Sequence, residues 1–321
     1  MIKPEMLRPG DLIGLVAPAG ATEAAAITTG VQVLERAGYR VRLGDSVFKR
    51  MGFLAGNDAE RAADLAAMFA DPEVRAIIAA RGGYGSGRLL PHFDIELARR
   101  NPKIFVGYSD LTFLLTQLVQ RAELVTFHGP MVAGMALHSD AAMGLLGLLG
   151  GDRAGWNLAA RDVVQPGTAE GVLTGGCLSV LVSTLGTPYE IQTAGRLLFL
   201  EDVNEKPYRI DRMLTQLRQA GKLSTVSGVI FGEMPGCSAD PNEVVKVRDV
   251  IDEAFANVAY PVAYGLPSGH GRGSGTLPLG VRARLAGERL TLLESPFLEP
   301  TASFDKTQGE RMLDKLRVSS A

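Results

Sequence analysis

The chain has few of the residues that disulfide frameworks and metal clusters require. It contains two cysteines, Cys177 and Cys237, and four histidines in 321 residues. A single disulfide between the cysteines stays open, but two cysteines give no framework, so a reducing compartment is expected. We otherwise interpret both as small core residues. No Cys/His group has the spacing of a metal site, so no metal is expected.

Long apolar runs and a strong net charge are also missing. The most apolar stretch, MGLLGLLGG near residue 145, is too short to span a bilayer. The N-terminus, MIKPEMLRPGD, has no signal-peptide core. A net charge of -2 provides no basic surface for nucleic acid. We therefore expect a soluble, cytoplasmic protein with neither a membrane nor a nucleic-acid partner.

Predicted strands and helices alternate along the first half of the chain. This pattern indicates an α/β fold with a mostly parallel sheet whose faces are covered by helices. Functional residues in such sheets lie beyond the carboxyl ends of the strands. The predicted strands are 12–17, 39–44, 74–80, 104–106 and 124–130, and the clearest helices are 22–37 and 58–70.

The length favours two domains. We predict an N-terminal α/β domain over residues 1–150, a linker over 151–170, where periodicity is lost, and a second, β-rich α/β domain over 171–321. The second domain is predicted to contain strands at 196–202 and 226–232, helices at 207–221 and 241–258, and a hairpin within 276–295.

A strand, a sharp turn and a helix over residues 103–118 place Ser109 at the tip of the turn. A serine there is exposed, has a fixed direction and lies near backbone N–H donors, as a nucleophile requires. The alternative is that Ser109 only caps the following helix.

A serine nucleophile needs a base, and His270 is the best placed of the histidines. It lies in GLPSGHGRGSGTLPLG, a glycine-rich loop that allows close approach to a partner. The alternative is that His270 is an exposed loop residue without a catalytic role. His128 ends a predicted strand and is expected to bond to the backbone.

An acidic residue must orient the imidazole, and Glu201, at the end of the apolar strand RLLFLED, is the candidate. The alternative is a buried glutamate paired with Arg209 or Arg212. Asp202, which points to the opposite face of the strand, is the second choice.

The oxyanion of a tetrahedral intermediate needs two N–H donors, for which we predict Asp110, directly after the nucleophile, and Gly83. Gly83 lies in the loop 81–87, RGGYGSG, which does not fit a dinucleotide-binding fingerprint, so no cofactor is expected. The glycines could instead serve only to turn the chain. Arg81 could bind a substrate carboxylate or form a structural salt bridge.

The chain resembles the LD-carboxypeptidases, the muramoyltetrapeptide carboxypeptidase family of serine peptidases. The resemblance rests on motifs in the family's order, chiefly ARGGYGSGRLLP, PKIFVGYSDLTFL, RLLFLEDVNEKPYRIDRMLTQL and GLPSGHGRGSGTLPLG. The family's catalytic Ser, Glu and His fall on Ser109, Glu201 and His270. The resemblance also implies a site between two domains, a homodimer and no metal. Cys177 stands where members usually have Asn.

The reaction implied by the resemblance is removal of the terminal D-alanine from a murein tetrapeptide during cell-wall recycling. One alternative is a microcin-immunity-like peptidase acting on a peptidyl nucleotide. That function needs an aromatic loop residue for the base, and Trp156, the sole tryptophan, lies in the predicted linker. Another alternative is a non-catalytic muropeptide-binding module, which the presence of all three triad residues disfavours.

Overall fold

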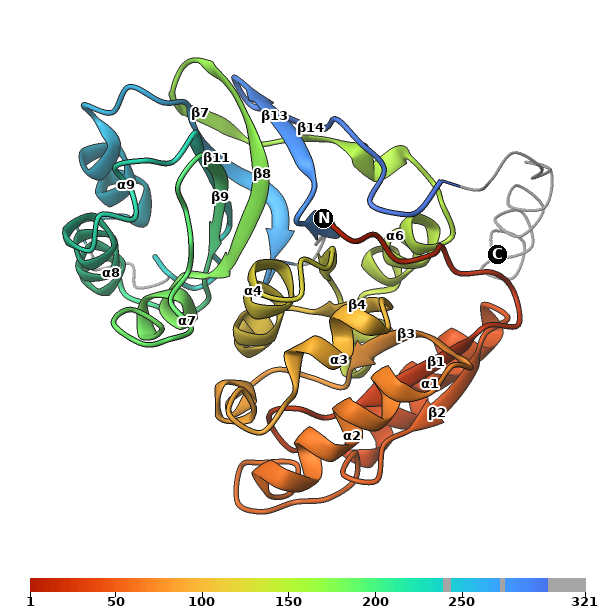
Figure 1. Cartoon of the computed structure of the whole chain (residues 1–321). Coiled ribbons are helices and arrows are strands. Elements are labelled where there is room, and N and C mark those ends of the chain that lie inside the picture. Colours follow the sequence, from red (N-terminus) through yellow and green to blue (C-terminus); the bar gives the residue numbers. More distant parts are fainter. Residues whose placement is uncertain (239–243, 272–274, 300–321) are drawn as a thin grey trace.

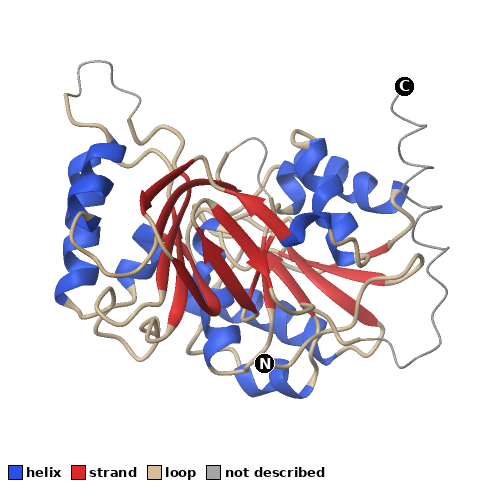
Figure 2. Cartoon of the chain, turned by 90° about the horizontal axis from the view of Figure 1, so that it is seen from above, coloured by secondary structure: helices blue, strands red, loops and turns tan. Residues whose placement is uncertain are grey.

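Two β-sheets with helices around them form the protein. The computed structural model describes residues 1–238, 244–271 and 275–299 (Figure 1). Seen from above, the strands of both sheets run through the middle of the molecule and the helices lie outside them (Figure 2). The two-domain α/β class predicted from the sequence is confirmed. Among the described residues, no helix is long and apolar enough to cross a membrane.

The first sheet has six strands in the order β12-β5-β4-β3-β1-β2. Its five N-terminal strands are parallel, and β12 pairs antiparallel with β5 at the edge. The strands are β1 (Leu12–Val16), β2 (Arg40–Leu43), β3 (Val74–Ala79), β4 (Ile104–Gly107), β5 (Thr126–His128) and β12 (Leu277–Leu279). The accompanying helices are α1 (Ala24–Arg36), α2 (Asp58–Ala70), α3 (Ile95–Arg100), α4 (Thr112–Gln120), α5 (Val132–Met135) and α6 (Ser139–Leu149).

The second sheet has eight strands in the order β6-β14-β13-β8-β9-β10-β11-β7. Its centre, β8 to β11, is parallel, and the strands on either side pair antiparallel. The strands are β6 (Asn157–Ala159), β7 (Asp162–Gln165), β8 (Thr168–Cys177), β9 (Arg196–Glu201), β10 (Gly228–Glu233), β11 (Val262–Gly269), β13 (Arg282–Ala286) and β14 (Arg289–Leu292). The helices are α7 (Leu178–Ser183), α8 (Pro207–Gln219) and α9 (Val247–Phe255).

One hydrophobic core extends through both sheets, from Ile13 and Phe105 in the first to Phe199 and Ala263 in the second. A smaller core lies between the second sheet and α7, α8 and α9, which stand together on its outer side (Figure 1). The sheets are therefore packed on each other through apolar side chains, and the polar residues between them are enclosed.

Three sequence predictions need correction. The predicted linker 151–170 contains a 3₁₀ turn, η3 (Ala154–Trp156), the strands β6 and β7, and the start of β8, so it belongs to the second sheet. Short edge strands with mixed polarity lack the alternation that reveals longer ones. Of the helix predicted over 241–258, α9 forms only Val247–Phe255, while 241–243 lie outside the described residues. The third needs only narrower bounds: the predicted hairpin within 276–295 is confirmed as β13–β14, and the preceding β12 joins the first sheet. The domain boundaries stay a prediction.

Candidate active site

Ser109 lies in a strained turn directly after β4. Its φ of 61° is in the left-handed region, which residues with a side chain seldom adopt. It begins a short 3₁₀ turn, η2 (Ser109–Leu111), and α4 follows with Leu111 as its N-cap. Ser109 therefore does not cap α4, and the strain points to a site in which the direction of the hydroxyl matters.

The glycine loop after β3 packs against this turn. A Cβ on Gly82 would lie 3.0 Å from Cβ and 3.1 Å from Oγ of Ser109, and 3.4 Å from the backbone N of Asp110. Gly83, with a φ of 100°, instead faces Arg81 and Gly20. Gly82 is thus the residue of this loop that packs on Ser109, and the assignment of Gly83 to the oxyanion hole stays a prediction.

Asp110 links the serine turn to the glycine loop by hydrogen bonds. Its buried carboxylate accepts a hydrogen bond of 2.7 Å from the backbone N–H of Ser86, and its carbonyl accepts one of 2.6 Å from the Ser86 hydroxyl. Ser86 opens the 3₁₀ turn η1 (Ser86–Leu89). These two bonds fix the backbone on the C-terminal side of Ser109 relative to the glycine loop.

Glu201 and His270 form a close pair at the ends of β9 and β11, the two strands that flank β10 in the second sheet. Glu201 ends β9 and is fully buried, and His270 directly follows β11. His270 Nδ1 lies 2.6 Å from Glu201 Oε2, and the imidazole side chain is 13% exposed. A Cβ on Gly269, whose φ is 125°, would come within 2.9 Å of Oε2, so only glycine leaves the pair room there.

The ring of Tyr108 connects this pair to the serine turn. Tyr108 precedes Ser109, and its ring meets the His270 imidazole edge-on at 4.9 Å between centroids. Burial, with the nearby Glu201 carboxylate, raises the pKa of Tyr108. The structure thus brings the serine turn, His270 and Glu201 to one place.

Electrostatics keep the buried glutamate ionised. Burial alone would raise the pKa of Glu201, but the neighbouring imidazoles outweigh it and hold that pKa below its ordinary value. His270 is at hydrogen-bond distance, whereas His128 Nε2 lies 3.6 Å from Glu201 Oε1. We therefore attribute the lowered pKa mainly to His270.

His128 is the residue that sequence reasoning missed. It is fully buried at the end of β5, with its ring edge-on to Phe199 at 5.2 Å and to Tyr108 at 5.9 Å. Neither ring nitrogen has a hydrogen-bond partner among the described residues, contrary to the predicted bond to the backbone. A histidine that begins an HGP sequence at the end of a strand gives no signal for a partner on the other sheet.

The alternatives for Glu201 are not realised in the structure. Arg209 pairs with Glu205 at 3.3 Å, and Arg212 lies over the ring of Tyr208 at 5.5 Å. The second choice, Asp202, accepts bonds from the backbone N–H groups of Ser179 and Val203, at 2.8 and 2.9 Å. Asp202 thus holds the first turn of α7 and is turned away from His270.

Arg81 is exposed, and its guanidinium donates a hydrogen bond of 3.1 Å to the carbonyl of Ala21. It forms no ion pair with any described residue, so the structural salt bridge considered above is absent there. It acts electrostatically on Tyr108, which places its charge near the serine turn.

Cys177 and Cys237 are buried free thiols, as expected of core residues. Cys177 caps α7, and its backbone N–H donates a hydrogen bond of 3.0 Å to the Thr112 hydroxyl at the start of α4. Burial and the nearby Glu201 and Asp202 raise the pKa of Cys177. The thiol therefore stays protonated beside the glutamate.

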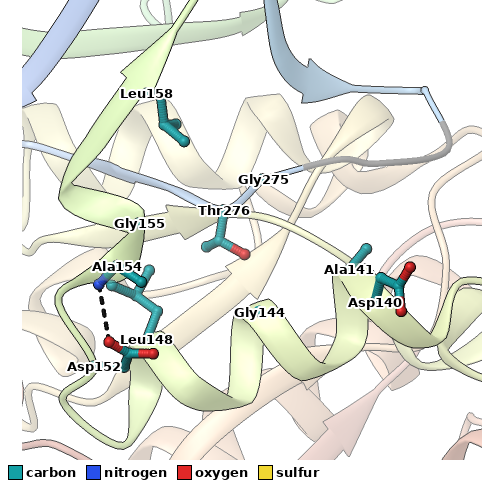
Figure 3. Close-up of a pocket in the computed structure, with 10 residues that line it drawn as sticks. All are labelled: Asp140, Ala141, Gly144, Leu148, Asp152, Ala154, Gly155, Leu158, Gly275 and Thr276. Atoms are coloured by element: carbon teal, nitrogen blue, oxygen red, sulfur yellow. Dashed lines mark hydrogen bonds between the residues drawn. The ribbon is translucent and has the colours of Figure 1, made fainter.

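One cavity borders the site and a second lies next to it. The first, about 40 Å³, is lined by Tyr108, Met131, His138, Ala141 and His270, among others. The second, about 220 Å³, lies beside α6 and shares Ala141 with the first. Figure 3 shows it between α6, the turn at Asp152–Gly155 and the segment of Gly275 and Thr276. The space beside His270 thus continues toward α6.

Known protein families match both halves of the chain. The profile of the LD-carboxypeptidase N-terminal domain matches residues 13–129, and that of the C-terminal domain matches residues 170–285. A relative in Bacillus subtilis, "Probable murein peptide carboxypeptidase", is 40% identical over 91% of this chain and 94% of its own length. The "Murein tetrapeptide carboxypeptidase" of Pseudomonas aeruginosa is 32% identical over 87% of this chain and 94% of its own.

Solved structures agree with these matches. The muramoyltetrapeptide carboxypeptidase from Oxalobacter formigenes superposes with a TM-score of 0.76, at 30% identity over 88% of this chain and 97% of that one. The microcin C7 self-immunity protein MccF superposes with a TM-score of 0.85, but at 23% identity, over 93% of this chain and all of that one. The second likeness is one of fold.

Proposed function

The chain belongs to the LD-carboxypeptidase family, and from that membership we propose that it is a serine carboxypeptidase acting on murein tetrapeptides. It would remove the terminal D-alanine by cutting the bond after diaminopimelate. The observation that carries this proposal is the Glu201–His270 pair, 2.6 Å apart, beside the strained turn of Ser109. Named relatives that cover nearly the whole chain support the substrate class.

In the proposed reaction, Ser109 Oγ attacks the carbonyl carbon of the scissile amide. His270 Nδ1 faces Glu201, which leaves Nε2 to take the proton from Oγ and later to give it to the amine of D-alanine. The acyl-enzyme on Ser109 is then hydrolysed by water that His270 activates. Glu201 fixes the tautomer of His270 and stabilises its charged form.

The oxyanion would be held by the backbone N–H of Asp110 and by one from the glycine loop, Gly82 or the predicted Gly83. The packing of Gly82 on Ser109 supports this loop as the second donor. The terminal carboxylate of the substrate needs a cation, and we propose Arg81, which is exposed and near Tyr108.

We do not extend the proposal to a peptidyl nucleotide. The likeness to MccF at 23% identity concerns the fold. Trp156, the aromatic residue considered for base stacking, is partly buried in η3 and is covered by the guanidinium of Arg153 at 4.7 Å from its ring centroid. A non-catalytic module would have no need of an ionised glutamate buried against a histidine.

The test is release of D-alanine from a free or disaccharide-linked tetrapeptide, measured by chromatography, for the wild type and Ser109→Ala. We expect release by the wild type and none above background by the variant, whose far-UV circular dichroism stays unchanged. Equal release by the variant would remove Ser109 as nucleophile, and no release by the wild type from a panel of tetra- and pentapeptides would remove the proposed substrate class.

Three finer features are proposed from the family resemblance alone: a role in peptidoglycan recycling, a cytoplasmic location and a homodimer. Light scattering after size exclusion measures the oligomeric state. A mass corresponding to one chain of 34.1 kDa at micromolar concentration would contradict the dimer.

A further inference from the structure

The catalytic carboxylate proposed above faces two imidazoles from two different sheets. Its Oε2 is bound to His270, at the end of β11 in the second sheet. Its Oε1 points toward His128, at the end of β5 in the first sheet, and has no hydrogen-bond partner among the described residues. An ionised carboxylate accepts hydrogen bonds at both oxygens, so Oε1 of Glu201 is free to accept a bond from His128, the described imidazole that it faces.

Two atoms that lack a hydrogen-bond partner among the described residues, His128 Nε2 and Glu201 Oε1, face each other. His128 Nε2 lies 3.6 Å from Glu201 Oε1, and both atoms are fully buried. The separation exceeds a hydrogen bond and is too short to hold a bridging water, so a shift of roughly half an ångström would close it. Hydrogen bonds of a catalytic site are often long without substrate and tighten when it binds.

The ring of His128 is held in the orientation that this bond requires. Phe199 lies edge-on to it on one side and Tyr108 on the other, at 5.2 and 5.9 Å between centroids. The backbone is fixed as well, since His128 pairs with Gly107 of β4 and Leu277 of β12. A buried imidazole without any partner would cost free energy for no gain, so a role for it is expected.

We propose that His128 is a positioning residue that donates its Nε2–H to Glu201 Oε1 and so holds the carboxylate in place for His270. His128 acts through Glu201, without touching the substrate. Because the two sheets each contribute one imidazole to the same carboxylate, the relay is complete only when the sheets are docked. This inference rests on the proposed function of Ser109, Glu201 and His270.

The other titratable groups around the carboxylate are accounted for. Tyr108 and Cys177 face it as neutral groups, since burial and Glu201 raise the pKa of each. Asp202 is bound to backbone N–H groups of α7. Glu233, on β10, has its pKa raised by burial and by Glu201, against the influence of Arg161. None of these supplies a donor to Oε1, so the contribution of His128 can be separated from theirs.

Three variants at residue 128 separate the effect of the N–H donor from the effect of the aromatic ring. His128→Phe keeps an aromatic ring between Phe199 and Tyr108 but has no donor. His128→Gln places an amide N–H at the position of Nε2, and His128→Asn places it at the position of Nδ1. The measurement is D-alanine release from a tetrapeptide, giving kcat, KM and the pH profile for each variant, with folding checked by thermal melting.

We expect His128→Phe and His128→Asn to lower kcat roughly 10- to 100-fold, the value of one hydrogen bond to a charged group, with KM unchanged. Without this donor the Glu201–His270 pair holds its proton more tightly, so the acid limb of the pH profile of kcat moves to higher pH. His128→Gln restores both kcat and the position of the acid limb. A wild-type kcat in His128→Phe would overturn the proposal, as would equal losses of kcat in all three variants with the acid limb unmoved.

A measurement on the unmutated protein needs neither turnover nor a folded variant. In histidine labelled with ¹⁵N, the shifts of the ring nitrogens identify the tautomer. We expect a neutral Nε2–H tautomer for the buried imidazole of His128, whatever the substrate proves to be. A neutral Nδ1–H tautomer would turn a lone pair toward Oε1 and would overturn the proposal, while leaving the proposed peptidase function standing.

Discussion

At the scale of single residues, the backbone of Ser109 is strained, because the tight turn that presents its hydroxyl has a left-handed backbone angle at this position. Its φ of 61° costs a residue with a Cβ about 1 to 2 kcal/mol relative to glycine. Both Ser109→Ala and Ser109→Gly remove the nucleophile, but only glycine relieves the strain.

We therefore expect both variants to be inactive and Ser109→Gly to be more stable than Ser109→Ala by about 1 kcal/mol. Urea unfolding followed by circular dichroism gives the difference. Equal stability of the two variants would show that the turn relaxes once the hydroxyl is gone, so that the strain belongs to the serine and not to the fold.

The ionised Glu201 links stability to pH. Its pKa in the folded protein lies below the ordinary value, because the neighbouring imidazoles of His128 and His270 together outweigh the effect of burial. A carboxyl group whose pKa is lower in the folded than in the unfolded protein stabilises the native state at pH values above its unfolded pKa of about 4.3. This stabilisation is lost as the pH falls through the folded pKa. Glu201→Gln removes this contribution.

The free energy of unfolding of Glu201→Gln should therefore lie below that of the wild type at pH 7, and the gap should narrow below about pH 4. The same variant should lose roughly 10³- to 10⁴-fold in kcat, because a neutral amide does not hold the tautomer of His270 or stabilise its charge. Parallel stability curves from pH 7 to pH 3 would mean that Glu201 has the same pKa in the folded and unfolded states, which would contradict the lowered folded pKa.

Ser109, Glu201 and His270 could be found from the sequence because each couples a reactive side chain to a strand end or a glycine-rich loop. His128 could not, because TFHGP belongs to no turn or glycine-rich loop that would single out its imidazole, and only the packing of the two sheets shows that it faces Glu201. Similarly, two adjacent glycines look alike in a sequence. Their different backbone angles put Gly82 against Ser109 and turn Gly83 toward Arg81.

At the scale of elements, the glycine loop after β3 is the structure that most directly limits the nucleophile. A Cβ on Gly82 would press on Ser109 at 3.0 to 3.1 Å without backbone strain, whereas Gly83 has a φ of 100° and neighbours at ordinary contact distances. The two positions should therefore respond differently to the same substitution.

We expect Gly82→Ala to lower kcat roughly tenfold or more by displacing Ser109, with little loss of stability. Gly83→Ala should cost about 1 to 2 kcal/mol of stability through its backbone angle. Steady-state kinetics and urea unfolding of the two variants test this pair. A larger loss of kcat in folded Gly83→Ala than in Gly82→Ala would favour Gly83 as the residue beside the oxyanion, as the sequence predicted.

Elements with strong local signals could be predicted closely. The helix 58–70 has the bounds of α2, and Asn57 and Glu60 form the expected capping box. Helix α8 starts at Pro207, and Gly221, with a φ of 73°, follows its end. The edge strands β6 and β7 and the crossing strand β12 carry no such signal, because their pairing partners are set by tertiary packing.

At the scale of the whole molecule, the halves of the chain do not separate cleanly. Strand β12 comes from the C-terminal part and completes the first sheet beside β5, next to His128. The main hydrophobic core includes Phe105 from the first sheet and Phe199 from the second. Opening the space between the sheets would therefore expose apolar surface and uncouple the imidazoles that flank Glu201.

This arrangement predicts that the full chain unfolds in one cooperative transition. Trp156, the sole tryptophan, lies in η3, which contacts α6 beside the first sheet and β14 of the second. Its fluorescence therefore reports on that region, while far-UV circular dichroism reports on all helices and strands. We expect the two urea curves to coincide, and a fragment of residues 1–150, which lacks β12 and leaves β5 uncovered, to give no such transition.

A fluorescence change at lower urea concentration than the loss of circular dichroism would instead mean that the two sheets separate while each stays folded. Docking of the sheets would then be a separate equilibrium, and kcat should fall with the fluorescence, since Glu201 needs both imidazoles in place.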